Sequence, residues 1–335
     1  KLALLIIAAA LLAYLSASFI TGGVVRRFFE QATSAVSFKK AAQAPQPPAA
    51  PEVQRQPEQN ADQQEAAQML SVYIPAAKLA TEDADTLVQQ LRSKGIGFAA
   101  IEFKDEAGSI LFDAPQSKAI VPQAVQQQIG SEALQKFKAA GIKTAAVISL
   151  FKDDTAPRSY GDCATKLSGG MLWLDRNEKR WIDPYTEAAK TYLGAVVADA
   201  AALGFDEIIF RDCGFPTEGK INLINYADGG VSKSDRVTDF VKYLSERAQG
   251  LKTSVWQPEK ALTNAEYAAE AGLSFEGSAL PMIPLLRDVL PDDIYSAIPS
   301  LKDNFTAVES AGLNAQQINS LVAALKEQGI KAFMF

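Results

Sequence analysis

The chain has 335 residues, of which 48% are hydrophobic and 21% charged, so it can bury the core of one large domain. A formal net charge of -6 argues against a general nucleic-acid binder, because neutralising phosphates requires clustered Lys and Arg. The sequence has no histidine, which excludes Ser-His-Asp triads, histidine bases and histidine-containing zinc sites. Any chemistry must therefore use carboxylates, Lys, Tyr or Cys.

An almost uninterrupted apolar run covers residues 2–25. A helix of this length spans a bilayer core of about 30 Å. We therefore expect residues 1–27 to be a transmembrane anchor, with a cleaved signal segment ending near Leu15-Ser16-Ala17 as the alternative. The anchor predicts a single-pass cell-membrane protein whose folded domain lies outside the cytoplasm, and cleavage predicts a secreted protein.

The next segment, residues 28–68, is predicted to be a linker, because Ala, Pro, Gln and Glu dominate it from residue 41 onward. Segments of this composition stay extended and act as semi-rigid spacers. The folded domain is then expected over residues 69–335. A poorly ordered domain edge without a spacing role is the alternative.

After residue 69, short β-rich apolar runs alternate with helical patterns, which is typical of a parallel α/β fold. Three predicted helices stop at a Gly that is followed by Ile, as in Gly95-Ile96 and Gly141-Ile142. Strands are predicted at 70–74, 97–103, 144–150, 207–210, 253–256, 277–283, 305–308 and 331–335. Helices are predicted at 82–94, 132–140, 187–203, 234–248, 264–271 and 315–328.

Eight strands over about 265 residues match the size of a (β/α)8 TIM barrel, which is the α/β fold that we predict. A doubly wound open sheet is the alternative. No G-x-G-x-x-G follows the first strand and the sequence has no Walker A motif, so nucleotide-binding folds are disfavoured. The sequence also lacks metal-ligand spacing. We expect neither a cofactor nor a metal.

Four motifs carry a family resemblance, at residues 100–108, 151–153, 169–185 and 204–216. Through them, residues 71–220 resemble the family described as a putative glycosyl hydrolase domain. The resemblance implies a barrel related in shape to the α-amylase group, and hydrolysis of carbohydrate. In the family pattern an Asp directly follows the Phe of the fourth strand, whereas this chain has Arg211 there and Asp212 one residue later.

Glycoside hydrolysis uses two carboxyl groups across the scissile bond, one of them held protonated. Related barrels carry them on the fourth and fifth strands, so the resemblance points to Asp212 with Glu259, and Glu102 is a further catalytic candidate. Because strand side chains alternate between faces, Asp212 would point away from the expected side unless a bulge re-aims it. The neighbouring Arg211 should lower the pKa of Asp212, which favours a nucleophile.

Polar and aromatic residues near these carboxylates are expected to contact a glycan. Glu102 and Lys104 should share one face of the second strand, as a ligand site or as a buried ion network. Trp173 and Trp181 flank a polar turn and suit a sugar platform, whereas Trp256 is expected in the core. The expected substrate-binding residues are Lys104, Asp105, Asp153, Trp173, Trp181, Asp183 and Arg211.

The chain has two cysteines, Cys163 and Cys213. Export would favour a disulfide between them, and both are expected to follow strands at the same end of the barrel. Two free buried thiols are the alternative.

The sequence thus predicts an extracytoplasmic glycoside-hydrolase-like barrel that binds or hydrolyses cell-envelope or extracellular polysaccharide. The alternative is a catalytically degenerate glycan-binding or envelope-scaffold protein in which Arg211 has replaced the nucleophile. A protein-interaction module is a third reading, and it predicts an exposed apolar patch instead of an aromatic-lined cleft. The expected partners are a polysaccharide or oligosaccharide and, through the N-terminal segment, a membrane, but not nucleic acid.

Overall fold

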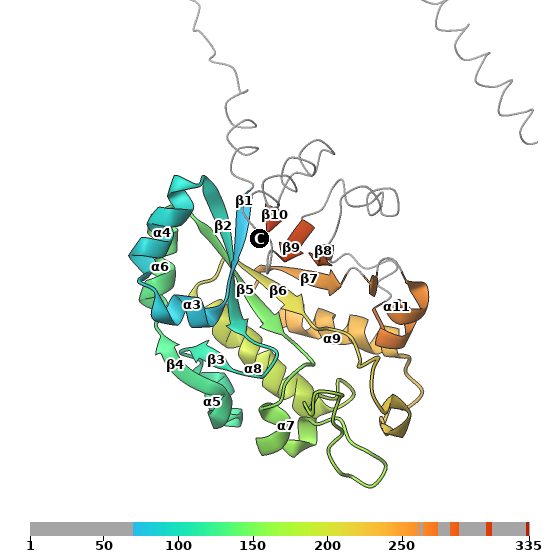
Figure 1. The fold of residues 1–335 in the computed structure, drawn as a ribbon. Coiled ribbons are helices and arrows are strands. Elements are labelled where there is room, and N and C mark those ends of the chain that lie inside the picture. Colours follow the sequence, from blue (N-terminus) through green and yellow to red (C-terminus); the bar gives the residue numbers. More distant parts are fainter. Residues whose placement is uncertain are drawn as a thin grey trace, which may run out of the picture. The chain divides into compact units, whose positions relative to one another are not determined.

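The computed structural model describes residues 70–258, 260–261 and 264–273, and the backbone of 282–287, 306–309 and 333–334. All of them belong to one compact unit, Pro57–Phe335 (Figure 1). The expected anchor and linker, residues 1–68, lie outside the described residues. Within the part of the chain that is described, no helix is long and apolar enough to cross a membrane.

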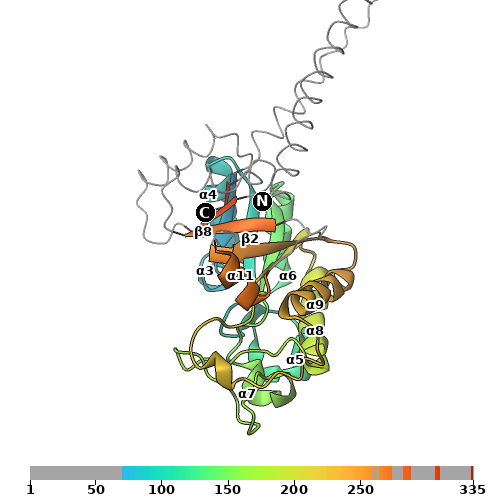
Figure 2. The same ribbon diagram turned by 90° about the vertical axis from the view of Figure 1, so that its right-hand side faces the viewer.

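Parallel strands form the centre of the unit (Figures 1 and 2). The strands named at the end of this paragraph, taken in chain order, each pair in parallel with the next. The last of them, β10, pairs in parallel with the first, β1, so these strands close into a ring. This closure distinguishes the sheet from the open doubly wound alternative. The ring strands are β1 (Leu70–Ile74), β2 (Ile96–Lys104), β5 (Lys143–Ser149), β6 (Glu207–Arg211), β7 (Lys252–Pro258), β8 (Met282–Arg287), β9 (Thr306–Glu309) and β10 (Phe333–Met334).

Two short strands outside the ring make the sheet mixed. β3 (Ile110–Phe112) returns antiparallel to the end of β2, and β4 (Val125–Ile129) pairs in parallel with β3. Neither strand is among those predicted above, and β4 in particular carries no strand pattern. Only the two ends of β4 are buried, and the three glutamines between them are exposed, so the strand has no apolar alternation.

Helices lie against the outer face of the ring (Figures 1 and 2). In α4 the buried residues are Ala84, Leu87, Val88 and Leu91, an i, i+3, i+4, i+7 stripe that faces the strands. The helices are α3 (Ala76–Thr81), α4 (Ala84–Ser93), α5 (Pro115–Ile120), α6 (Ser131–Ala139), α7 (Ala156–Ser159), α8 (Glu187–Leu203), α9 (Lys233–Arg247) and α11 (Ala265–Ala271), with short 3₁₀ turns at η1 (Pro122–Ala124), η2 (Gly161–Cys163) and η3 (Ile221–Leu223).

The ring separates two apolar clusters. The larger one lies between strands and helices and includes Ile101, Ile148 and Phe210. The smaller one takes alternate residues of the same strands, so it faces the inside of the ring. Its members are Ala100, Ala145, Val147, Ile209 and Trp256, with Tyr73 and Phe98 packed against them. The two alanines leave room for the large rings, and the Tyr73 and Trp256 ring centroids lie 5.7 Å apart.

A long connection from β5 to α8 covers the carboxyl-terminal ends of the strands. Isolated antiparallel bridges join its two arms, among them Lys152 to Trp181 and Lys166 to Leu172. Asp154 accepts from Arg158 at 2.7 Å and from Arg180 at 2.8 Å, and so ties the returning arm to α7. This connection supplies one wall of the candidate site.

Candidate active site

A cavity of about 510 Å³ lies at the carboxyl-terminal ends of β6 and β7, within the size range of small-molecule sites. Its ionisable lining includes Glu106, Lys152, Asp175, Arg211 and Asp212. Its aromatic lining consists of Trp181, Phe215, Trp256 and Tyr267.

Asp212 enters this cavity because the backbone turns sharply after β6. Its φ is 52°, in the left-handed region that Asp tolerates better than most residues. Consecutive strand residues normally point to opposite faces, yet Arg211 and Asp212 both line the cavity. The left-handed backbone at Asp212 thus turns its side chain toward the cavity, a change of direction that the sequence analysis expected only from a bulge.

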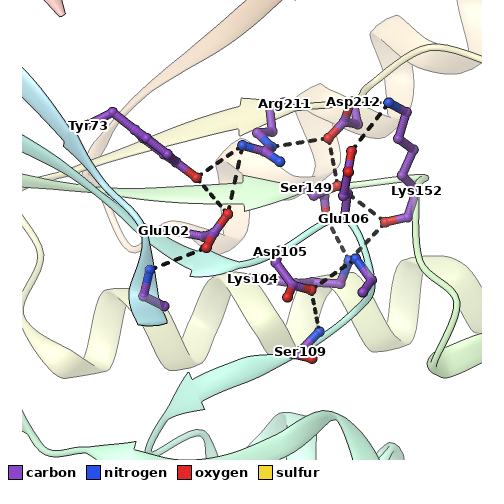
Figure 3. Close-up of polar contacts among 12 residues, drawn as sticks. Tyr73, Glu102, Lys104, Asp105, Glu106, Ser109, Ser149, Lys152, Arg211 and Asp212 are labelled. Atoms are coloured by element: carbon purple, nitrogen blue, oxygen red, sulfur yellow. Dashed lines mark hydrogen bonds and ion pairs between the residues drawn. The ribbon is translucent and has the colours of Figure 1, made fainter. Parts of the chain in front are cut away.

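Three groups hold the Asp212 carboxylate (Figure 3). Ser149 Oγ donates to Oδ2 at 2.8 Å and Arg211 Nε donates to the same atom at 3.2 Å, while Lys152 Nζ lies 3.4 Å from Oδ1. Burial alone would raise the pKa of Asp212, but the charges of Lys152 and Arg211 and the Ser149 hydrogen bond hold it below its usual value. The expected direction is confirmed, with Lys152 the stronger contributor.

Lys152 also joins Asp212 to a second carboxylate, Glu106. Because its Nζ lies 3.4 Å from Asp212 Oδ1 and 3.5 Å from Glu106 Oε2, these two oxygens are at most about 7 Å apart, a limit that includes the spacing of about 5 Å in retaining glycosidases. Burial would lower the pKa of Lys152, but Asp212 and Glu106 raise it, so the ammonium stays charged. It lies 5.9 Å from the centroid of the Trp181 ring.

Sequence reasoning missed both Glu106 and Lys152 as site residues. Each stands inside a motif that carried the family resemblance, next to a residue that was chosen instead. Glu106 lies in the turn from β2 to β3, where strand alternation gives no direction for a side chain. The bridge from Lys152 to Trp181 that brings the ammonium to the cavity is a tertiary contact.

Glu102 belongs to a network beside the cavity and is not part of its lining (Figure 3). Tyr73 donates its hydroxyl to Glu102 Oε1 at 2.6 Å, and Arg211 Nη1 lies 3.1 Å from that hydroxyl and 3.9 Å from Glu102 Oε1. Burial raises the pKa of Tyr73, and the Glu102 charge adds to this effect against the opposing Arg211. The network orients the guanidinium that holds Asp212.

Lys104 does not share the surroundings of Glu102, because the pairing of β2 with β5 is irregular between these two residues. Lys104 Nζ lies 3.0 Å from Asp153 Oδ2, with both side chains fully buried, and donates to Ser149 O at 2.8 Å. The other Asp153 oxygen accepts backbone N–H groups of Thr155 and Ala156. The structure therefore places Lys104 and Asp153 in a buried pair behind the cavity.

Asp105 and Asp183 also lie outside the cavity lining. Asp105 Oδ1 accepts the backbone N–H groups of Ala107 and Ser109, which fixes the turn after β2. Asp183 is 5% exposed and accepts the Tyr185 N–H at 2.9 Å. Burial raises the pKa of Asp183 to about 6.

One of the three tryptophans, Trp173, does not lie where the sequence predicted. Trp181 lines the cavity and donates its indole N–H to Asp175 at 3.0 Å. Trp173 was expected in the platform but is 1% exposed, packs edge-on against Trp181 and donates to Lys220 O at 3.1 Å. Trp256 belongs to the inner apolar cluster, as expected, and also lines the cavity.

Cys163 and Cys213 are both free and buried, so the expected disulfide is not present. The two thiols lie in different surroundings. Cys163 is near the Lys104–Asp153 pair and Cys213 follows Asp212 in the cavity wall. Burial raises the pKa of both, to about 12 for Cys163. Glu259, the other expected catalytic residue, lies outside the described residues.

Residues 71–256 match the family described as a putative glycosyl hydrolase domain. The chain belongs to this family. The match contains every motif that carried the resemblance and every described residue of the carboxylate network.

Among solved structures, a hypothetical protein from Ruminiclostridium thermocellum is 23% identical with a TM-score of 0.50, over 55% of this chain and 96% of that one. The glycoside hydrolase domain of PelA from Pseudomonas aeruginosa is 12% identical with a TM-score of 0.46, over 79% and 93%. A family 20 exo-β-N-acetylglucosaminidase from Vibrio harveyi is 11% identical with a TM-score of 0.48, and this chain covers 41% of it. No curated protein matches.

Proposed function

We propose that the closed ring of strands is a (β/α)8 barrel. Parallel pairing along the whole series, closure of β10 on β1, and helices on the outer face support this architecture. The cavity lies at the carboxyl-terminal ends of the strands, where barrels of this kind carry their active sites.

We propose that the domain binds a glycan in this cavity and hydrolyses a glycosidic bond with Asp212 and Glu106. The observation that carries the proposal is the Lys152 ammonium, which contacts both carboxylates and so brings them within a range that includes the spacing of retaining glycosidases. Membership of the family described as a putative glycosyl hydrolase domain supports the reaction class. The apolar run 2–25 supports an extracytoplasmic location, where envelope or extracellular polysaccharide is the substrate.

The environments of the two carboxylates suggest different roles. Asp212 has a lowered pKa and stays ionised, so it acts as the nucleophile or as the base that activates water. Glu106, on the exposed turn after β2, is the partner carboxyl that this assignment places at the leaving oxygen. Trp181 offers its ring to a sugar beside this pair.

The test is release of reducing ends by the full chain from a panel of cell-wall and storage polysaccharides. Asp212→Asn and Glu106→Gln should each lower kcat by about a hundredfold or more, with glycan binding retained. Glu246→Gln, which removes an exposed carboxylate of α9 that does not line the cavity, should leave turnover unchanged. Turnover that survives Asp212→Asn would contradict the assignment.

A second candidate function is glycan binding without hydrolysis. It is favoured by the occupation of both Asp212 oxygens, since a carboxylate bound by Ser149, Arg211 and Lys152 is a weak nucleophile. Under this alternative the wild-type chain binds glycans but releases no reducing ends from any of them.

A further inference from the structure

The indole N–H of Trp256 is a buried donor without an acceptor among the described residues, which suggests that a ligand supplies the acceptor. Its side chain is 5% exposed and lines the cavity, and no described residue accepts a hydrogen bond from its indole N–H. An indole nitrogen can only donate, and a buried donor without an acceptor destabilises the fold. The other two tryptophans, Trp173 and Trp181, both have acceptors. Trp256 is therefore the exception.

The ring is held in place by packing. Tyr73 lies against it with the two planes 55° apart, and Ala100, Val147 and Ile209 complete the cluster around it. Close packing of this kind fixes the side-chain rotamer. The N–H therefore cannot turn toward another acceptor at little cost.

A second donor lies beside the same tyrosine. The Arg211 guanidinium carbon lies 6.0 Å from the Tyr73 ring centroid, and Arg211 also lines the cavity. Among the described residues, Arg211 Nε contacts Asp212, and Nη1 contacts Tyr73 and Glu102. None of these contacts uses Nη2, which is therefore available to a ligand. Two donors, one of them cationic, thus lie next to Tyr73 and belong to residues that line the same cavity.

We infer that this cavity binds a carbonyl-type oxygen of the glycan, with Trp256 Nε1 as its donor and Arg211 as the second cavity-lining donor. An indole N–H and a guanidinium only donate, so they select a group that accepts, and a guanidinium favours a carboxylate or a carbonyl oxygen. A uronic acid carboxylate and an N-acetyl carbonyl both supply this chemistry, whereas an unsubstituted glucan supplies hydroxyls. This inference rests on the proposed function, because it names the substituent that the same cavity recognises.

The test uses the full chain labelled with ¹⁵N at its tryptophans, which gives three indole signals, and Trp256→Phe assigns one of them. The probes are oligosaccharides of galacturonic acid, of N-acetylglucosamine and of glucose. We expect the galacturonic acid or the N-acetylglucosamine probe to shift the Trp256 signal downfield, and the glucose probe not to. Trp256→Phe should weaken that binding roughly tenfold or more.

A ligand-free comparison tests the unpaired donor separately. Trp256→Phe and Trp173→Phe remove the same atoms from buried sites, but only the latter leaves an acceptor, Lys220 O, without its donor. Trp256→Phe should therefore lower the midpoint of thermal unfolding less than Trp173→Phe does. An equal or greater loss would overturn the inference, because it would mean that the Trp256 N–H is satisfied in the folded chain.

The remaining outcomes separate this inference from the proposed function. A probe that binds and shifts the Trp181 signal but not that of Trp256 overturns the inference and leaves the proposed function standing. A glucose probe that shifts Trp256 as strongly as the others overturns the choice of acceptor. Failure of every probe and of every polysaccharide to bind overturns the proposed function, and this inference with it.

Discussion

At the scale of single residues, Gly108 shows how the buried ion pair depends on a missing side chain. Its φ is 89°, and a Cβ at this position would collide with the carboxylate of Asp153, the partner of Lys104. Gly108→Ala should therefore lower the free energy of unfolding by about 2 to 4 kcal/mol, from backbone strain and the displaced ion pair together. Urea denaturation measures the loss.

Gly95→Ala is the matched control for this prediction. Its φ is 70°, and a Cβ there would have no heavy atom within 4 Å, so only the backbone strain remains, about 1 kcal/mol. The excess loss of Gly108→Ala over Gly95→Ala measures the collision. Equal losses would mean that Asp153 moves aside without cost, against the role given to the pair.

At the scale of elements, one helix supplies the amino-terminal cap of another. Asp199 lies in α8 and is 2% exposed, and its carboxylate accepts from Gln116 N at 3.1 Å and from Ser117 N and Oγ, both at 2.7 Å. These N–H groups belong to the first turn of α5, which has no side-chain cap of its own. The contact fixes α5 against α8.

Asp199→Ala should leave these buried donors without an acceptor and lower the free energy of unfolding by about 2 to 4 kcal/mol. Asp239→Ala in α9 removes an exposed carboxylate from a helix and should change stability by less than about 0.5 kcal/mol. The two variants are compared by denaturant unfolding. A loss for Asp199→Ala no larger than that of the control would show that α5 does not need the cap.

The same scale shows what the sequence could predict. The ring strands were predicted to within a few residues, because buried parallel strands read as apolar runs, although β8 begins at Met282, later than the expected 277. The longer helices were predicted in the same way, because their apolar residues recur with the period of a helix. The resemblance, together with their place at a strand end, made Asp212 and Arg211 candidate site residues, and both line the cavity.

What the sequence could not show depends on departures from regular geometry. The left-handed Asp212 and the irregular register after Glu102 each change the direction of a side chain, and no periodicity reports them. For the same reason Glu102 and Lys104 were assigned to one face although they have different partners. The cavity contact of Trp256 was invisible because an apolar strand residue reads as core.

At the scale of the whole molecule, the ring separates the main apolar core from the candidate site. The outer cluster between strands and helices holds most of the buried apolar residues. The inner cluster is small and ends in the ionic network of Tyr73, Glu102 and Arg211, and it contains the Trp256 N–H, for which no described residue is an acceptor. Such strained or unsatisfied groups persist where the surrounding structure compensates for them, and they concentrate at functional sites.

Stability of the whole domain should depend on pH through Asp183. Burial raises the pKa of this carboxyl to about 6 in the folded state, above the roughly 3.9 of an unfolded chain. The folded state therefore binds this proton more tightly, so the contribution of Asp183 is fully present below about pH 4 and is lost as the pH rises through 6. The shift corresponds to roughly 3 kcal/mol.

Asp183→Asn removes this titration while it keeps an oxygen for the Tyr185 N–H. Other carboxyl groups, such as Asp212, titrate in the opposite sense, so the informative quantity is the difference in unfolding free energy between variant and wild type. That difference should move in favour of Asp183→Asn by roughly 3 kcal/mol between pH 4 and pH 8, because only the wild type must then bury a charge. Asp239→Asn, at an exposed position, should give a flat difference in the same denaturant series. A flat difference for Asp183→Asn as well would mean that Asp183 is ionised at the same pH in the folded and the unfolded chain, and that Arg236 and Lys166, the nearby cations, offset its burial completely.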